Sequence, residues 1–313
     1  MYATMFSLLL TMAFVIALLD TFLIPKTMEL VPPDSASQDL IASEQTPAIY
    51  GRTSPSGETE NAAYTDHEEQ AAPVITSTSY KDNNISISIE SIRVYDTDVY
   101  IADVIVSSVE HLKTAFARNT YGRNINEKTS VIAGNQNAIF AINGDYYGFR
   151  DEGWVLRNGV LYRSGGNDAA LLMDREGTFS CGSDRASIGK QSPELWQIWS
   201  FGPPLVVEGE IAVLENQEIL GRSSNSNPRT AIGQVGTLHY IFIVSDGRTA
   251  ESAGLSLYEL ASLFSERGCS VAYNLDGGGS SVMYFNGRIV NKPTTGGRKI
   301  SEREVSDIVY IGY

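Results

Sequence analysis

The stretch from Ser256 to Ser281 reads SLYELASLFSERGCSVAYNLDGGGSS, and it predicts a helix, a strand and a glycine-rich loop in direct succession. Ser256 and Glu259 have the spacing of a capping box, the leucines that follow share one face, and Gly268 suits the position after a helix end. Residues 270–275, SVAYNL, then form a strand. This order presents the polar groups that follow the strand at the edge of a sheet.

Strands are expected to dominate the rest of the folded region. Residues 85–89 alternate Ile and Ser, and residues 99–106 are again strand-like, whereas residues 109–117 predict a short helix. Three further segments place Asn-Gly or Glu-Gly between apolar runs, which is typical of tight hairpins, namely residues 154–162, 205–213 and 283–290. The predicted fold is α+β, with mixed, strand-dominated sheets and a few packed helices in a single domain over residues 80–313.

The N-terminal quarter of the chain differs from this domain in composition. Residues 2–25 form an apolar run interrupted by Asp20, long enough to cross the roughly 30 Å hydrocarbon core of a bilayer as a transmembrane helix. The run lacks a basic n-region and an evident cleavage site, which favours a signal-anchor over a cleaved signal sequence. Residues 26–79 are rich in Pro, Ser, Thr and Glu and predict a disordered acidic stalk. The domain is therefore expected to be extracytoplasmic, either anchored in a membrane or secreted.

Charge and residue usage exclude several classes of protein. The formal net charge of −14 leaves no basic surplus to neutralise phosphates of nucleic acid, so nucleic acid is not expected as a partner. Cys181 and Cys269 permit one disulfide, but two buried thiols are the favoured interpretation. His67, His111 and His239 are scattered, which gives little material for a zinc site or a Ser-His-Asp triad. Carboxylates are thus expected to carry any proton chemistry.

Four segments share one pattern, in which an apolar strand ends and a small polar cluster containing glycine follows. Side chains at strand ends are held rigidly, and glycines let a ligand approach the backbone, so this pattern favours a binding site. For a single segment an ordinary turn is the favoured interpretation, and it is the occurrence of four such segments that favours a site. The four segments are residues 138–148, 227–233, 240–248 and 271–281.

The last of these segments predicts a phosphate site. Gly277, Gly278 and Gly279 offer successive amides and Ser280 and Ser281 offer hydroxyls, which together resemble an anion-binding nest. The segment is neither a Walker A loop nor a Rossmann fingerprint. An arginine is needed to bind a phosphodiester through two hydrogen bonds, and the candidates are Arg229 and Arg248, each of which can equally be structural.

The order of these motifs resembles that of the phosphodiester glycosidase family, which includes bacterial proteins of exopolysaccharide biosynthesis. The resemblance covers about residues 85–313 and omits the apolar run and the stalk. Its most specific part is Asn-Leu-Asp-Gly-Gly-Gly-Ser. The motifs that carry it are Asn143-Gly-Asp-Tyr-Tyr147, Ser200-Phe-Gly-Pro-Pro-Leu-Val-Val-Glu-Gly209, Asn227-Pro-Arg-Thr-Ala-Ile-Gly233, Asp246-Gly-Arg248, Asn274-Leu-Asp-Gly-Gly-Gly-Ser-Ser281 and Arg303-Glu-Val-Ser-Asp-Ile308.

What the resemblance implies is a hydrolase that cleaves the glycosidic bond of sugar 1-phosphodiesters and releases free sugar and a phosphomonoester. The expected substrate is a sugar-phosphate glycan or glycopolymer of the cell surface or its surroundings. Asp276 is expected as base or nucleophile at the anomeric carbon, Asp145 or Asp246 as its partner, and Asn143 as an orienting hydrogen-bonding residue. Retention or inversion of the sugar depends on a carboxylate separation that stays open here.

The same residues allow other interpretations. A pocket rich in Asp and Asn can hold a divalent cation, although no EF-hand spacing is present and no cofactor or metal is expected to be required. A non-catalytic module that binds phosphate-containing polysaccharide or cell wall is one alternative, and a metal-dependent phosphodiesterase is another. Ser280 or Ser281 as a nucleophile lacks a histidine base. Asp307 is expected as either a buried partner for an arginine or a functional group.

Overall fold

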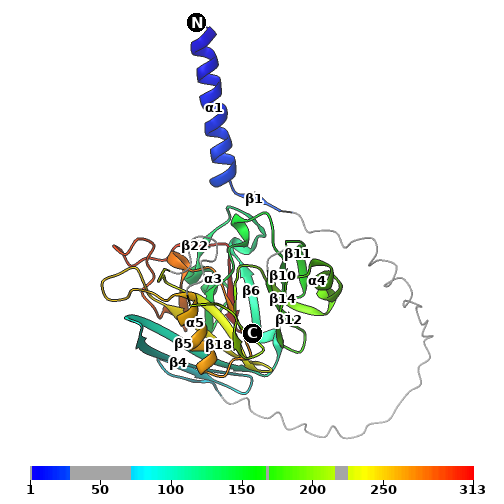
Figure 1. Cartoon of the computed structure of the whole chain (residues 1–313), viewed down its shortest axis with the longest axis vertical. Coiled ribbons are helices and arrows are strands. Elements are labelled where there is room, and N and C mark those ends of the chain that lie inside the picture. Colours follow the sequence, from blue (N-terminus) through cyan, green and yellow to red (C-terminus); the bar gives the residue numbers. More distant parts are fainter. Residues whose placement is uncertain (1, 29–71, 167–168, 216–224) are drawn as a thin grey trace, which may run out of the picture.

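A nine-stranded antiparallel sheet forms the centre of the molecule, which is a computed structural model describing residues 2–28, 72–166, 169–215 and 225–313 (Figure 1). Its long middle strands are paired over ten residues, from Ile85–Val106 to Val94–Thr97. In spatial order the strands are β16 (Glu210–Ile211), β15 (Pro204–Val207), β19 (Val271–Asn274), β17 (Thr230–Gly236), β18 (His239–Ser245), β5 (Thr97–Val106), β4 (Ile85–Val94), β3 (Ser79–Lys81) and β2 (Val74–Ile75).

Two five-stranded antiparallel sheets accompany the central sheet. The first consists of β11 (Val160–Arg163), β10 (Val155–Arg157), β14 (Leu195–Trp199), β12 (Ala170–Asp174) and β13 (Phe179–Gly182). The second consists of β21 (Arg288–Ile289), β20 (Met283–Phe285), β9 (Phe140–Asn143), β23 (Asp307–Ile311) and β6 (Leu112–Phe116). Two short ribbons pair β1 (Lys26–Thr27) with β7 (Gly122–Arg123) and β22 (Glu304–Val305) with β8 (Glu127–Lys128).

Helices are few and short apart from the first. The α-helices are α1 (Tyr2–Phe22), α3 (Thr129–Asn135), α4 (Arg185–Gln191) and α5 (Leu257–Glu266). Single 3-10 turns are η1 (Val109–His111), η2 (Ala117–Asn119), η3 (Tyr147–Phe149), η4 (Ser192–Glu194) and η5 (Gly278–Ser280). The predicted strand-dominated α+β domain is confirmed.

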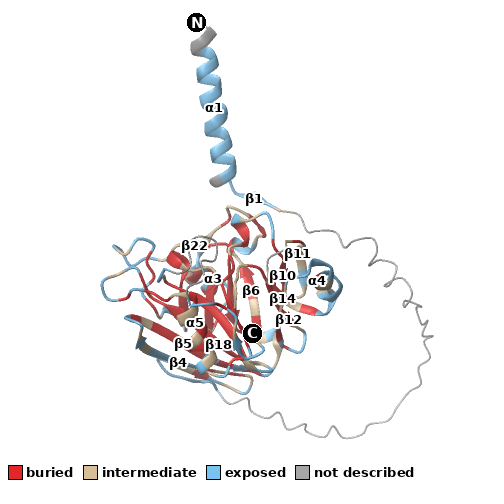
Figure 2. Ribbon diagram, viewed as in Figure 1, coloured by how far each residue is buried: buried red, intermediate tan, exposed pale blue. Residues whose placement is uncertain are grey.

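One hydrophobic core joins the three large sheets. Ile87 and Phe242 of the central sheet, Trp199 of the first five-stranded sheet, and Phe140 and Val309 of the second belong to the same buried cluster. Alternation along each strand explains this, since one face of the central sheet carries these side chains and the other carries a second cluster beneath α5. Figure 2 shows the buried residues concentrated where the sheets face one another. The layering fixes the strand ends that build the site.

The local predictions around tight turns and the capped helix are confirmed. In the three predicted hairpins, Asn158, Glu208 and Asn286 have positive φ and each precedes a glycine that also has positive φ, as a type I′ turn requires. Helix α5 begins with a capping box in which the side chains of Ser256 and Glu259 bond each other's backbone N–H. Both cysteines are free thiols.

The short helix predicted over residues 109–117 is wrong. Only η1 and the first residue of η2 are helical there, and β6 lies between them, pairing with β23 from Leu112–Ile311 to Phe116–Asp307. The buried Leu112 and Thr114 alternate with the half-buried Lys113, which is strand periodicity. Pairing with a buried neighbouring strand therefore outweighs the helical tendency of this segment.

The N-terminal region is helical as far as Phe22. Helix α1 extends away from the domain in Figure 1, and its side chains are exposed from Met5 to Thr21. By length and hydropathy, no helix in the described ranges qualifies as a membrane span. The segment after α1 contacts the domain through the β1–β7 ribbon. Of the predicted stalk, residues 29–71 lie outside the described residues, and Val74–Ile75 already belong to the central sheet.

Candidate active site

The site lies where strand ends of the central sheet meet strand ends of the second five-stranded sheet. Strand β9 ends at Asn143 beside the start of β23, and β19 ends at Asn274 beside the start of β17. The amide of Asn143 joins the two edges, because its Nδ2 donates to the Asp276 carbonyl at 2.6 Å and its Oδ1 accepts from Thr230 Oγ1 at 2.8 Å. Three of the four predicted segments therefore converge here.

Asn143 acts on the loop rather than on a ligand. Its side chain is fully buried, and its Oδ1 also accepts from the backbone N–H of Val282 at 3.2 Å. These bonds clamp both ends of the loop 276–282. The predicted orienting role thus falls on the backbone of Asp276 and not on a sugar.

A small pocket of about 20 Å³ opens at this junction. Among the predicted site residues it contains Asp276 and Ser280. Its remaining lining consists of residues that follow β9 and residues that precede or begin β23, namely Gly144, Tyr146, Phe149, Arg303, Glu304, Val305, Ser306 and Asp307.

Asp276, Ser280 and Arg303 form the polar centre of the pocket. Arg303 Nη2 donates to Asp276 Oδ2 at 3.1 Å and to Ser280 Oγ at 2.6 Å, and Arg303 Nε donates to the same hydroxyl at 2.9 Å. The side chains of Asp276 and Arg303 are 13% and 38% exposed, so a ligand can reach both. Burial raises the pKa of Asp276, while Arg303 and Ser280 oppose that rise.

Arg303 is not one of the two arginines that the sequence predicted as phosphate-binding residues. It was visible as the first residue of the motif 303–308, directly before a predicted strand, but its position beside Asp276 depends on contacts 27 residues apart in the chain. Its backbone N–H donates to the Gly279 carbonyl at 3.2 Å, which fixes this approach.

Two aromatic side chains form an apolar wall of the pocket. The rings of Tyr146 and Phe149 are stacked, with centroids 4.5 Å apart and an interplanar angle of 16°. Phe149 is 37% exposed, and η3 holds both residues close to Gly144. Neither ring was predicted as part of the site, although Tyr146 belongs to the Asn143–Tyr147 motif. The pocket therefore has one charged side and one aromatic side.

The three glycines pack closely against neighbouring segments. A Cβ on Gly277 would lie 2.8 Å from the Pro228 carbonyl oxygen, and one on Gly279 would lie 2.4 Å from Thr295 Oγ1. Gly278 has φ +64° and donates its N–H to the Pro228 carbonyl at 2.8 Å. The loop needs glycine at these positions for its own packing.

Only part of the predicted anion nest is free to face a ligand. The N–H groups of Gly278, Ser280 and Ser281 donate to carbonyl oxygens of the protein, so they are not directed at a ligand. The Ser281 hydroxyl is fully buried, and its carbonyl oxygen accepts from Asn291. Ser280 reaches the pocket, but through a hydroxyl that Arg303 already binds. The N–H groups of Gly277 and Gly279 therefore stay the backbone candidates for binding an anion.

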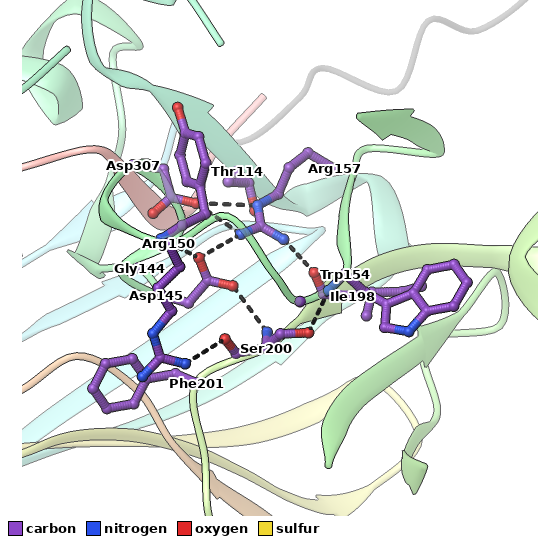
Figure 3. Close-up of polar contacts among 12 residues, drawn as sticks. Thr114, Gly144, Asp145, Arg150, Trp154, Arg157, Ile198, Ser200, Phe201 and Asp307 are labelled. Carbon is purple, nitrogen blue, oxygen red and sulfur yellow. Dashed lines mark hydrogen bonds and ion pairs between the residues drawn. The ribbon is translucent and has the colours of Figure 1, made fainter. Parts of the chain in front are cut away.

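Asp145, predicted as a catalytic partner, is buried in an ion pair and does not line the pocket. Arg157 Nη2 lies 2.8 Å from Asp145 Oδ1 and 3.0 Å from Asp307 Oδ2, and all three side chains are at most 2% exposed. Asp145 Oδ2 also accepts from the Ser200 N–H at 2.9 Å. Figure 3 shows Arg157 between the two carboxylates.

Asp307 therefore has the expected role of a buried partner for an arginine. Burial raises its pKa to about 7, Arg157 opposes this, and the neighbouring Asp145 adds to it. A Cβ on Gly144 would lie 2.2 Å from Asp307 Oδ1, so only glycine fits between this carboxylate and the pocket. Arg157 was missed. Its signal was a charge inside the apolar run Trp154-Val-Leu-Arg157, which demands a buried partner.

Asp246 also proves structural. It is 3% exposed, it is absent from the pocket lining, and burial raises its pKa. Its carboxylate accepts from the Lys292 N–H at 2.8 Å, from Asn291 Nδ2 at 3.2 Å and from the Tyr100 hydroxyl at 3.2 Å. These bonds hold the segment after β21 in place, and they favour a structural role for Asp246 over the predicted catalytic one.

Arg229 and Arg248 lie behind the loop. Arg229 is 9% exposed, its Nε donates to the Leu255 carbonyl at 2.9 Å, and burial together with Arg248 lowers its pKa to about 10. The exposed Arg248 donates to Asn227 Oδ1 at 3.0 Å and to the Thr295 carbonyl at 2.8 Å. Neither lines the pocket, so the geometry favours structural roles for both.

Side chains that can bind a metal are scattered over residues 2–28, 72–166, 169–215 and 225–313. Within those ranges, no three His, Cys, Asp or Glu side chains gather in a way that could hold a metal ion. The polar centre offers one carboxylate, one hydroxyl and one guanidinium, a set suited to binding an anion beside a carboxylate.

Known proteins share this architecture. The structure is similar to the catalytic domain of the zebrafish N-acetylglucosamine-1-phosphodiester alpha-N-acetylglucosaminidase, auto-inhibited by its pro-peptide. The TM-score is 0.60 at 22% identity, and the match covers 73% of this chain and 83% of that one. A hypothetical protein from Synechocystis matches with a TM-score of 0.56 at 13% identity over 74% of this chain and 62% of its own. These likenesses establish the fold.

Sequence relatives point the same way. The chain is 28% identical over 210 residues to the SPbeta prophage-derived uncharacterized protein YomE of Bacillus subtilis, covering 62% of this chain. It is 30% identical over 186 residues to the mouse N-acetylglucosamine-1-phosphodiester alpha-N-acetylglucosaminidase, covering 54% of this chain. The matches span 31% and 35% of those relatives, about a third of their lengths.

The family profile described as phosphodiester glycosidase matches residues 136–312, which is more than half of the chain and contains Asp276, Arg303 and the whole pocket lining. The chain belongs to the phosphodiester glycosidase family.

Proposed function

We propose that this protein hydrolyses the bond between the anomeric carbon of a sugar and the oxygen of a phosphodiester. Water supplies the oxygen that becomes bonded to the anomeric carbon, the carbon–oxygen bond to phosphate breaks, and the phosphomonoester leaves. The observation that carries the proposal is the pairing of Asp276 with Arg303 inside a pocket. A carboxylate and a guanidinium side by side suit an anomeric centre joined to a phosphate.

Arg303 is the proposed phosphate-binding residue. Its Nε and Nη2 make the bonds to Asp276 and Ser280, and a guanidinium carries further N–H donors on Nη1. A phosphomonoester leaving group has a second pKa of about 6, so it needs stabilisation of negative charge more than a strong general acid. Arg303 supplies that charge at the point where it develops.

Asp276 is the proposed catalytic carboxylate, acting as base on water or as nucleophile. Its pKa is raised by burial, and a base works best when its pKa lies nearer the operating pH. Asn143 holds the Asp276 backbone at 2.6 Å, which positions the carboxylate. The stacked Tyr146 and Phe149 are proposed to bind the apolar face of the sugar ring.

Product analysis on a panel of sugar 1-phosphodiesters tests this proposal. We use the whole chain with substrates that include N-acetylglucosamine 1-phosphodiesters, the group in the name of the mouse relative. The expected products are free sugar and phosphomonoester, and in ¹⁸O water the label should enter the sugar. Label in the phosphate would indicate P–O cleavage by a phosphodiesterase and would contradict the proposal.

Asp276→Asn is the matched variant, because it keeps the size of the side chain and removes its charge. We expect turnover to fall by about 1,000-fold or more with an unchanged unfolding midpoint. Full activity in this variant would show that another group does the chemistry. Saturable binding of the diesters without product, in the unmodified protein, would instead identify a binding module.

We further propose that residues 2–25 hold the domain at a membrane or direct its export, so that it acts on extracytoplasmic glycans. The support is the exposed apolar surface of α1, on which Phe6, Leu8 and Phe14 are each at least 65% exposed. Fractionation of cells with an alkaline wash, followed by N-terminal sequencing, tests both membrane anchoring and export. Recovery of the intact chain in the cytosol would contradict the proposal.

A further inference from the structure

A basic loop lies next to the pocket on a protein that is acidic as a whole. Residues 288–303 contain five basic side chains, Arg288, Lys292, Arg298, Lys299 and Arg303, against the single acidic Glu302, whereas the chain has a formal net charge of −14. Positive charge is therefore concentrated beside Asp276. The loop has no part in the chemistry proposed above except through Arg303.

One end of the basic loop, residues 288–303, is fixed to Asp246 and the other end to the loop 276–282. The Lys292 N–H donates to Asp246, and the Arg303 N–H donates to the Gly279 carbonyl at 3.2 Å. Between them, Arg248 binds the Thr295 carbonyl at 2.8 Å, and the Ser301 N–H binds the Pro293 carbonyl at 2.8 Å. The tip is thus presented at a defined place relative to the pocket.

The acidic residue of the loop is directed into the protein. The Glu302 carboxylate accepts from the N–H and the hydroxyl of Ser130, at 3.0 and 2.6 Å, in the first turn of α3. Its charge is therefore committed to that helix start. The cations at the tip are left to face solvent.

Arg298 and Lys299 are exposed and line a shallow depression together with Thr295, Gly296, Ser301 and Glu302. Over the described part of the chain, neither cation has a carboxylate within ion-pair distance. Lys299 is four residues from Arg303, so at most about 14 Å of extended backbone separates them. Sugar rings of a substrate chain can bridge such a span.

We propose that Arg298 and Lys299 form a second phosphate subsite, which binds the neighbouring phosphodiester of the substrate while Arg303 binds the one being cleaved. The substrate class is then an oligomer or polymer with phosphodiesters at successive sugar units. This inference rests on the proposed function for the position of the first phosphate. Because both cations are exposed, their contribution is modest and falls with ionic strength.

The experiment compares two synthetic oligomers of N-acetylglucosamine joined by 1→6 phosphodiesters, one with a single phosphodiester and one with four. In the Arg298→Ala/Lys299→Ala variant, we expect kcat/KM to fall about tenfold on the longer oligomer and to stay unchanged on the shorter one. The tenfold difference should disappear at 1 M salt, where the screening length is about 3 Å.

Arg185→Ala/Lys190→Ala is the matched control. It removes the same charge from α4, which lies on the other side of the molecule from the basic loop in Figure 1, and both residues are exposed. In this control we expect the ratio of kcat/KM between the two oligomers to stay as it is in the unmodified protein. An equal loss in the control would attribute the effect to net charge and overturn the proposal.

A binding measurement separates this inference from the proposed function. Calorimetry with Asp276→Asn, alone and combined with Arg298→Ala/Lys299→Ala, should show that the longer oligomer binds about tenfold more weakly when the loop cations are absent. If the unmodified protein hydrolyses neither oligomer, the proposed function fails, and this binding result still decides the loop. Equal binding with and without the cations, or a loss seen on phosphatidylglycerol vesicles and not on the oligomers, would overturn the second subsite.

Discussion

Two groupings of arginine with carboxylate follow the same local pattern but differ in burial. Asp145 lies two residues after Asn143 at the end of β9, and Asp276 lies two residues after Asn274 at the end of β19. Asp145 shares Arg157 with Asp307, and these side chains are at most 2% exposed. Asp276 pairs with Arg303, and their side chains are 13% and 38% exposed.

The difference in exposure distinguishes an ion pair that supports the fold from one that a ligand can reach. A buried ion pair has lost its water and depends entirely on its partners, so it fixes the strands that carry it. A partly exposed pair keeps access to ligand and contributes little to stability. The Asp145–Arg157–Asp307 network holds β9, β10 and β23 together, and it thereby places Gly144 and the pocket wall beside Asp276.

Removing the buried cation should have the largest effect on stability. Arg157→Met keeps much of the side-chain volume and leaves Asp145 and Asp307 buried without a counterion. We expect the free energy of unfolding to fall by about 3–5 kcal/mol, measured by urea denaturation.

The triple variant Arg157→Met/Asp145→Asn/Asp307→Asn tests whether charge is the cause. It removes the cation and both carboxylates together, and we expect it to regain most of the lost stability. If the triple variant is no more stable than Arg157→Met, packing and the bond to Ser200 dominate the network, and the contrast with the open pair loses its electrostatic basis.

The partly exposed pair of Asp276 and Arg303 should matter more for activity than for stability. In Arg303→Ala we expect kcat/KM to fall by about 100-fold to 1,000-fold, because a donor to the developing phosphate charge is removed. The free energy of unfolding should change by less than about 1 kcal/mol.

Arg303→Lys sharpens this result, because it keeps the charge but cannot bind Asp276 and Ser280 through a planar guanidinium. We expect it to recover only part of the lost activity. Full recovery would mean that charge alone matters, and a loss of stability as large as that of Arg157→Met would make Arg303 a framework residue.

Much of the fold was predictable because its signals are local. The capping box of α5 and the Asn-Gly turns at Asn158 and Asn286 depend on residues within a few positions of one another. The expected sheet-edge presentation of Asp276 also holds, since β19 ends at Asn274. The helix expected over residues 109–117 failed because β23, almost 200 residues later, pairs with that segment.

The candidate site was only partly predictable, because burial is not a local property. Asp145, Asp246 and Asp276 look alike in the sequence, each following an apolar strand, and only the contacts to Arg157, Lys292 and Arg303 distinguish them. The arginine beside Asp276 came from a distant segment that was recognised as a motif but not as a ligand group. Long-range pairing therefore decides which carboxylate is open.

The pH dependence of stability tests the charge state of the buried network. Burial raises the pKa of Asp307 from 3.8 to about 7, so between these values the folded state holds a proton that the unfolded state has released. The contribution of this group is fully present below pH 3.8 and is lost as pH rises to about 7. The free energy of unfolding of the unmodified protein, minus that of Asp307→Asn, should therefore fall with rising pH by up to about 1.4 kcal/mol per unit. Urea denaturation at several pH values between 4 and 8 measures this difference. A difference that is constant or grows with pH would mean that Arg157 keeps both carboxylates charged, so that the buried grouping resembles the open pair in charge state and differs from it in exposure alone.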